Sequence, residues 1–414
     1  MKRFFILLCL FSLSFSEEGL KAYQVYPFKQ TPFIPNISFL LDTSLVLRNE
    51  NNLDTLEVPG FLHGHGEEHA HGEFNREKGF NLNYGELFLN APVDPYFELY
   101  VTIPFSEEGV QLEEAYAVTR GLPHGFQVKA GKFRSSFGRL NSQHPHLWDF
   151  AQQPLIYRVF FGEGLVEKGV QINWLAPLPL YLLFGLEVLQ GENERSFGVK
   201  GFTLNTKRDG SGSEVRIGDA FRPGLFVGFL KTSFDLGSLS LLTGLSYALG
   251  NVRSIEEEEA FKGKVGIYGV DLTAKYFVDS YTYIALQSEY IHRNTEGTLY
   301  RYDEFGDLTA LYAEKRQGGF YVQAVWQFSR RWRAGFQYNL ITRNEVREAD
   351  QREDLPDNLP AYYGVLEFRP TEFSRVRFQL GQNRALYEEG ERKTINELIL
   401  QLTFAIGAHG AHPF

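Results

Sequence analysis

Hydrophobic and polar residues alternate along much of this chain, in segments of about ten residues. In residues 395–406, leucine, isoleucine and phenylalanine fill nearly every position of one parity, while Glu397, Gln401 and Thr403 lie on the other. The same period recurs in residues 317–328, 332–340 and 375–380. A period of two predicts β-strands with one apolar and one polar face. We therefore expect an all-β protein.

The connections between these segments alternate in length. Seven short turns are separated by eight connections that are mostly longer and more charged, which predicts sixteen strands. The expected longer loops include residues 251–263, 293–316 and 385–393. An even number of antiparallel strands, with both chain ends on one side, is typical of a transmembrane β-barrel, whereas a soluble β-sandwich has no reason to sort its loops by side. Eighteen strands remain an alternative, because residues 196–205 could add a pair. A slip in parity near Gly85 predicts a β-bulge.

A helical membrane protein is excluded by the hydrophobic pattern. Beyond the N-terminal region, the longest apolar stretch is Trp174–Leu186, and it contains Pro177 and Pro179. A spanning helix needs about 20 apolar residues. The barrel is therefore the membrane-spanning architecture that fits this sequence.

The N-terminus has the layout of an export signal. Lys2 and Arg3 precede a short apolar run that ends in small residues, so residues 1–16 are expected to be a secretory signal peptide. We expect residues 17–36 to form a periplasmic segment, residues 37–406 the barrel with a His-rich external loop at 50–78, and residues 407–414 a periplasmic His-containing tail. The predicted location is the outer membrane of a Gram-negative type of cell.

The amino-acid composition limits which partners the protein is expected to bind. The 414 residues include one cysteine, which excludes an internal disulfide bond, and the formal charge of −10 disfavours binding to nucleic acid. The expected partners are the lipid bilayer and small polar solutes or ions, and association into a homo-oligomer is compatible with the sequence. No motif of a hydrolase or metalloprotease is present, so we expect no enzymatic activity and no required cofactor.

The polar parity of the C-terminal strands predicts which residues line the lumen. They are Gln323, Arg331, Arg333, Gln337, Glu367, Arg369, Arg375 and Arg377. A row of guanidinium groups would hold anions and orient polar solutes. The alternative is that these residues are polar only because every barrel lumen is wet.

Histidines cluster in two external loops. His63, His65, His69 and His71 form a short tract with nearby glutamates, and His144 and His146 follow in the loop at 135–164. Imidazole and carboxylate ligands favour Zn(II) or a similar divalent transition metal. The alternative is a disordered loop with incidental metal affinity.

Two local motifs resemble known families. Gly131-Lys132-Phe133-Arg134 with Phe137-Gly138 is similar to an element of phosphate-selective porin-like barrels, and the combination of the His-rich loop, His144-Pro-His146 and the His-containing terminus resembles zinc-regulated outer-membrane receptors. These resemblances imply a sixteen-stranded barrel and a connection with zinc.

The sequence therefore predicts a porin-like channel for passive diffusion of small polar solutes or ions, with a His-rich loop that captures divalent transition metal. The alternative is a metal-binding outer-membrane surface protein that does not conduct.

Overall fold

The computed structural model describes residues 35–407, except for 52, 54–55, 62–73, 108, 163, 194, 256–258 and 350. Nearly all of the ordered elements are strands, joined by two short 3₁₀ turns, η1 (Pro123–Gly125) and η2 (Pro145–Leu147), and one short helix, α2 (Leu155–Phe161). The helices of this described part are all too short or too polar to cross a bilayer. The all-β prediction is confirmed.

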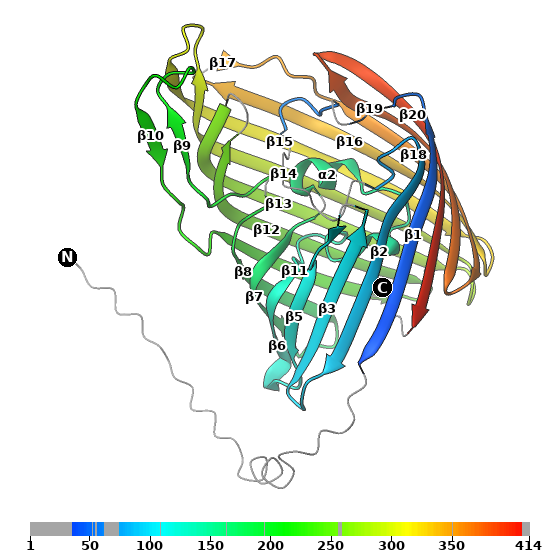
Figure 1. Ribbon diagram of the computed structural model, residues 1–414. Coiled ribbons are helices and arrows are strands. Elements are labelled where there is room, and N and C mark those ends of the chain that lie inside the picture. The colour runs from blue at the N-terminus through cyan, green and yellow to red at the C-terminus, as the bar shows by residue number, and fades with distance from the viewer. Residues whose placement is uncertain are drawn as a thin grey trace, which may run out of the picture. The chain divides into compact units, whose positions relative to one another are not determined.

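Sixteen long strands form one closed antiparallel barrel, in which each strand pairs with its neighbours along the chain (Figure 1). The ring closes where β1 pairs with β20, with Ser38 opposite Gly407 and Arg48 opposite Glu397. The barrel strands are β1 (Asn36–Arg48), β2 (Gly79–Pro92), β3 (Phe97–Ser106), β5 (Glu114–Thr119), β6 (Phe126–Arg134), β7 (Val166–Leu175), β8 (Tyr181–Leu189), β11 (Leu225–Leu236), β12 (Leu239–Ile255), β13 (Glu259–Phe277), β14 (Tyr283–Tyr302), β15 (Leu308–Gln327), β16 (Trp332–Glu348), β18 (Leu359–Thr371), β19 (Ser374–Glu388) and β20 (Glu391–Gly407).

The remaining strands lie in connections. β4 (Gly109–Val110) pairs with β3, and β17 (Gln351–Arg352) pairs with the end of β16. β9 (Phe202–Asn205) and β10 (Glu214–Ile217) form a separate two-stranded sheet between β8 and β11. The stretch at 196–205 therefore adds no strand to the ring, and the described barrel has sixteen strands, not eighteen.

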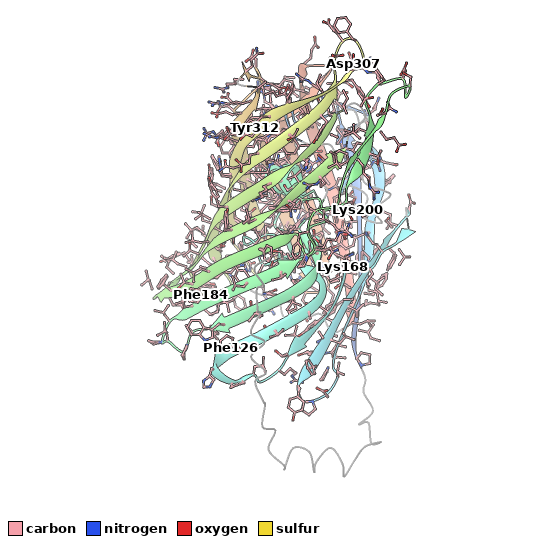
Figure 2. All side chains as sticks on the ribbon, turned by 90° about the vertical axis from the view of Figure 1, so that its left-hand side faces the viewer. Phe126, Lys168, Phe184, Lys200, Asp307 and Tyr312 are labelled. Carbon is pink, nitrogen blue, oxygen red and sulfur yellow. The ribbon has the colours of Figure 1, made fainter. Side chains whose placement is uncertain are left out.

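The two rims of the barrel differ, although less in loop length than the sequence predicts. The expected long loops at 251–263, 293–316 and 385–393 are mostly strand: β12 continues to Ile255, β14 runs to Tyr302, and β19 and β20 meet at a tight turn. β13, β14 and β15 have 19, 20 and 20 residues, about twice what a tilted strand needs to span a bilayer. These hairpins extend past the membrane and end near Asp307, at the end of the barrel opposite Phe126 and Phe184 (Figure 2).

The apolar side chains of the alternating pattern point outward. On β13, exposed Val270 and Leu272 lie between two exposed tyrosines, Tyr268 and Tyr276, eight residues apart. Eight residues at about 3.4 Å each span roughly 27 Å, and a tilt of about 40° reduces this to roughly 20 Å, comparable with the ~25 Å apolar band between aromatic girdles in membrane barrels. The outward side chains therefore match a lipid environment.

A bulge corrects the slip in parity on β2. Asp42 pairs with Tyr84 and Thr43 with Leu82, so Asn83 is the extra residue. Its side chain turns into the barrel, where Nδ2 donates to Asp42 Oδ1 at 2.7 Å and Oδ1 accepts from the Asn75 backbone N–H at 3.0 Å. The bulge that the sequence predicts near Gly85 is confirmed, two residues earlier.

An arginine at the centre of the outward band should destabilise the barrel. Leu272→Arg is expected to cost about 2–4 kcal/mol, because a guanidinium group at the membrane midplane loses its hydration. Tyr312→Arg, also outward but on the projecting part of β15 (Figure 2), should change stability by less than about 1 kcal/mol. Equilibrium urea unfolding in phospholipid vesicles measures both. Equal costs for the two variants would contradict the membrane placement.

Candidate functional site

The connection between β6 and β7 lies inside the barrel. We call residues 135–165 the folded-in segment. Loops usually cover a surface, but this segment is rich in large apolar residues, and six of the seven residues of α2 are buried. Phe137, Leu140 and Phe160 belong to one buried cluster with lumen-facing Ile267, Ile291 and Tyr321 of the strands. Figure 1 shows α2 within the ring of strands.

Glu289 on β14 fixes the start of the folded-in segment. Its carboxylate is buried and accepts four hydrogen bonds: from the backbone N–H groups of Arg139 and Leu140 at 2.8 and 2.9 Å, and from the hydroxyls of Tyr157 and Tyr321 at 2.7 and 2.6 Å. Burial raises the pKa of Tyr157 well above its usual value, which keeps the phenol protonated as a donor. Hydrogen bonds to a buried charge are stronger than neutral ones, so this contact holds the backbone at 139–140 in place.

The approach to Glu289 requires glycine at position 138. Gly138 has a φ of +63°, and a Cβ added there would lie 2.3 Å from Tyr157 Oη and 2.5 Å from Glu289 Oε2. Its N–H donates to Ser246 Oγ on β12 at 3.0 Å, and Lys231 Nζ on β11 donates to its carbonyl at 2.8 Å. Gly138 therefore lets the segment run close against the wall of the lumen.

Other contacts attach the segment to further strands around the ring. The Ser136 N–H donates to Glu187 on β8 at 2.8 Å, whereas the Leu155 N–H donates to Asn339 on β16 at 3.0 Å. The Ala151 N–H donates to Gln379 on β19 at 2.8 Å. Because these partners lie on strands distributed around the barrel, the segment crosses the lumen.

The loop expected at 50–78 also enters the barrel in part. Val58 and Phe61 are buried in the same apolar cluster, and the ring of Phe61 lies 5.4 Å from that of Phe160 in α2. Glu57 pairs with Tyr387 of β19 as an isolated bridge. The first external loop and the folded-in segment therefore pack against each other inside the ring.

Most of the arginines predicted to line the lumen meet at one carboxylate. Glu367, fully buried on β18, accepts from Arg333 Nε at 2.7 Å, Arg369 Nε at 2.7 Å and Arg377 Nε at 3.0 Å, and Arg375 Nε lies 3.9 Å away. Four cations around one carboxylate leave excess positive charge.

The folded-in segment supplies hydrogen-bond acceptors for these guanidinium groups. Arg333 Nη1 donates to Asp149 Oδ1 at 2.7 Å, Arg377 Nη2 to the Trp148 carbonyl at 2.6 Å, and Arg375 Nη1 to the His146 carbonyl at 2.9 Å. The arginines face inward as predicted, but they bind the segment, and Arg333, Arg375 and Arg377 are buried. Whether they line a path for solutes stays a prediction.

The other residues predicted to line the lumen do not all lie in this network. Gln337 Nε2 donates to Gln323 Oε1 at 2.9 Å, and Gln323 Nε2 donates to Asp149 Oδ2 at 2.9 Å, so both glutamines belong to the same buried network. Arg331 is apart from it: it lies exposed in the turn between β15 and β16, before β16 begins at Trp332.

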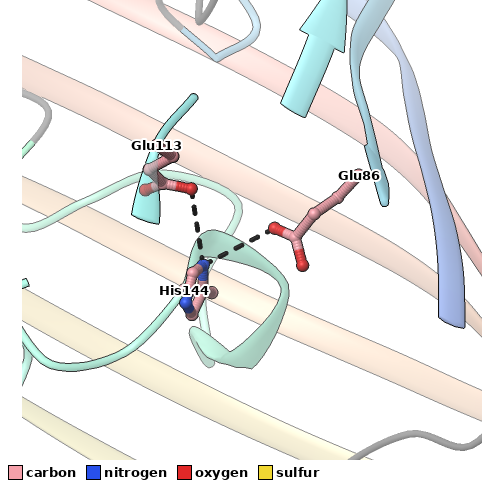
Figure 3. A group of neighbouring side chains, drawn as sticks. All are labelled: Glu86, Glu113 and His144. Atoms are coloured by element: carbon pink, nitrogen blue, oxygen red, sulfur yellow. Dashed lines mark ion pairs between the residues drawn. The ribbon is translucent and has the colours of Figure 1, made fainter. Parts of the chain in front are cut away.

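Only two of the predicted metal ligands lie among the described residues. His63, His65, His69 and His71 lie outside the described residues. His144 and His146 flank Pro145 at η2, with rings stacked at 5.8 Å, and they face carboxylates of the barrel wall. Figure 3 shows His144 between Glu86 of β2 and Glu113, just before β5. Burial alone lowers the pKa of His144, but Glu86 and Glu113 outweigh it and raise the pKa well above its usual value.

Sequence reasoning missed the acidic residues of this interior: Asp42, Glu86, Glu113, Asp149 and Glu289. Four of them lie in or beside strands, and an acidic side chain on the inward parity was a usable signal for Asp42 and Glu289. Asp149 had no such signal, because its position depends on how the folded-in segment crosses the lumen.

Removing the charge of Glu289 should release the folded-in segment. Glu289→Gln is expected to cost about 1.5–3 kcal/mol, because an amide cannot accept the four hydrogen bonds as a carboxylate does. Urea unfolding gives the cost, and limited proteolysis should show new cleavage within 135–165. Glu296→Gln, the same change at an exposed site on β14, is the control. Identical behaviour of the two variants would show that Glu289 does not hold the segment.

Solved structures with a similar fold are outer-membrane channels. The outer membrane channel DcaP of Acinetobacter baumannii aligns with a TM-score of 0.52 at 11% identity, covering 92% of this chain and 99% of that one. OprB of Pseudomonas putida and the anion-selective porin from Comamonas acidovorans each align with a TM-score of 0.50 at 11% identity; both cover 90% of this chain, and the alignments span 94% and 100% of those proteins. At this identity the likeness shows the fold alone.

No protein-family model matches this chain. An uncharacterized protein of Aquifex aeolicus (strain VF5) is 62% identical over 405 residues, which cover 96% of this chain and 84% of that protein. The chain therefore belongs to the same family as that Aquifex aeolicus protein, and its fold is that of the porin barrel.

Proposed function

We propose that this protein is an outer-membrane channel for passive diffusion of small polar solutes or ions. Three features support the proposal: the ring is closed by β1 and β20, the outward face is apolar between aromatic girdles, and the inward parity is polar and charged. A closed barrel pairs every strand in lipid, and at sixteen strands it is too wide for wall side chains to fill.

The position of the folded-in segment decides which solutes could pass through the barrel. It crosses the lumen and bonds to strands around the ring, so any passage is confined to the space beside it. Asn173, Lys231 and Lys275 on the inward parity remain partly exposed near the rim of short turns. A passage of this kind would admit small polar solutes or ions and exclude larger ones.

The second candidate is a barrel that does not conduct and acts as a metal-binding surface protein. The burial of the lumen favours it: the side chains of Asn339, Arg377 and Gln379 face inward at mid-barrel, and each is 0% exposed. In a wide aqueous pore these groups would contact water. The two candidates differ in one measurable property, ionic conductance.

Planar-bilayer recording separates the two candidates. We expect the native protein to give small stepwise conductances, and a variant in which residues 143–161 are replaced by a short Gly/Ser linker to give steps several-fold larger, because the linker no longer crosses the lumen. The control replaces 303–307, the turn between β14 and β15, with the same linker and should conduct like the native protein.

Three outcomes assign the function. Conductance of the native protein supports the channel. Conductance of only the 143–161 variant supports the plugged surface protein. Silence of all three proteins, with their barrels folded by circular dichroism, rejects both the passage and the blocking role of the segment. If the linker variant does not fold, Gln379→Ala, which removes the acceptor for the Ala151 N–H, tests the same attachment.

We also propose that the tract His63, His65, His69 and His71 captures divalent transition metal, with zinc as the first candidate. Four imidazoles with nearby glutamates within nine residues support this, since such ligands suit Zn(II). The reversal potential in asymmetric salt should shift on adding Zn(II) to the native protein. It should shift less after His63→Ser, His65→Ser, His69→Ser and His71→Ser together, and an unchanged response would reject capture by the tract.

Other finer properties stay predictions from the sequence. These are the likeness to phosphate-selective porins or zinc-regulated receptors, association into a homo-oligomer, and export by residues 1–16, which lie outside the described residues.

A further inference from the structure

A histidine and two glutamates converge where the folded-in segment meets the barrel wall. Glu86 comes from β2, Glu113 from the residue before β5, and His144 from the segment itself (Figure 3). Three sequence-distant parts of the chain thus direct ligating atoms to one point, and these atoms all lie within 4.8 Å of one another.

The spacing of these atoms does not suit direct hydrogen bonds. His144 Nδ1 lies 3.5 Å from Glu86 Oε2 and 3.5 Å from Glu113 Oε2. A hydrogen bond between nitrogen and oxygen is about 2.7–3.2 Å long. Two ligands each about 2.0–2.2 Å from a tetrahedral zinc ion are separated by roughly 3.3–3.6 Å. The observed distances match two ligands of one ion.

The other nitrogen of the ring is already engaged. His144 Nε2 lies 2.8 Å from Glu114 Oε2, a hydrogen bond in which Nε2–H donates to the carboxylate. In the neutral ring this leaves the Nδ1 lone pair directed at Glu86 and Glu113. A carboxylate that orients the far side of a histidine ring is the usual outer partner of a metal-bound imidazole.

Two of the atoms are buried without a hydrogen bond. Among the described residues, neither His144 Nδ1 nor Glu86 Oε2 has a hydrogen-bond partner, and the Glu86 side chain is 5% exposed. An unsatisfied buried carboxylate oxygen carries a large desolvation cost. A bound cation would satisfy both atoms at once.

The local charge also favours a cation. Glu86, Glu113 and Glu114 bring three carboxylates together, and Arg134, which pairs with Glu113, supplies one fixed positive charge. A divalent ion would offset the remaining two negative charges. Imidazole nitrogen among the ligands favours a transition metal over Mg²⁺ or Ca²⁺, which prefer oxygen alone.

We propose that Glu86, Glu113 and His144 bind a divalent first-row transition metal of the zinc type. The fourth position is filled by water or by His146, whose Nδ1 lies 3.7 Å from Glu86 Oε1. The proposal uses no residue of the His63–His71 tract and does not depend on whether the barrel conducts. The ion would join the folded-in segment to β2 and to the start of β5.

The test uses full-length protein in which His63→Ser, His65→Ser, His69→Ser and His71→Ser remove the competing tract. After treatment with a chelator, Zn(II) binding is followed by competition with a chromophoric indicator, and Co(II) is added separately to read coordination from its visible spectrum. We expect a tight site with the intense absorption of four-coordinate cobalt and a higher midpoint of thermal unfolding with zinc.

Matched variants locate the ion. Glu86→Gln with Glu113→Gln keeps the shape of the site and should abolish the tight site, the cobalt spectrum and the thermal shift. Glu114→Gln, which loses only the outer carboxylate, should weaken binding about 10–100-fold. His124→Ala, at an exposed histidine in a short turn, should bind as the parent does.

Two outcomes would overturn the proposal. Tight binding that survives Glu86→Gln with Glu113→Gln places the metal elsewhere, for example on His409 and His412. Folded parent protein that binds neither Zn(II) nor Co(II) shows that the cluster is only a protonated imidazole paired with carboxylates. If the double variant fails to fold, His144→Gln gives the same reading, because it retains a polar side chain but no imidazole.

Discussion

Every backbone polar group of this barrel has to be paired within the protein, because lipid offers no hydrogen-bond partner. That constraint is met where β20 returns to β1, with eleven residue pairs in continuous register from Ser38 to Arg48. Closure fixes which parity faces lipid and which faces the lumen. The apolar outer band, the bulge at Asn83 and the inward direction of the charged residues are all consequences of it.

The interior satisfies the same requirement with side chains and with a segment of the chain itself. Two buried carboxylates that would be hydrated in an open pore have several partners here. Glu289 accepts from four donors, and Glu367 is surrounded by arginines that in turn reach Asp149 and two carbonyl groups of the folded-in segment. Buried ion pairs add little net stability, but removal of one partner is costly. They therefore define one position for the segment rather than tighten the barrel.

The sequence predicted the parts of the fold that follow from a period of two. The inward parity of Arg333, Glu367 and Arg377 and the bulge were readable from alternation, and sixteen strands in a closed ring followed once the short and long connections between the alternating segments were counted. The projecting hairpins were not, because charge was used to mark loops, and a strand beyond the membrane can carry charge on both faces while it keeps its backbone pairs.

The candidate site was only half predictable for a related reason. His144 and His146 stood out by residue type, but Glu86 and Glu113 lie in other parts of the chain and meet them only through the path of the folded-in segment. That path depends on Glu289, Asn339 and Gln379, which are 149, 184 and 228 residues away from their partners. No local pattern encodes contacts of this range.

Those separations also bear on how the molecule is assembled. The hydrogen-bond partners of residues 135–165 extend as far as β19 and β20. The segment therefore cannot make all of its contacts until the last strands have joined the barrel. Until then, part of its apolar surface lacks its final contacts, and exposed apolar surface of this kind favours aggregation during assembly. Docking of the whole segment can therefore be completed only once β19 and β20 are in place.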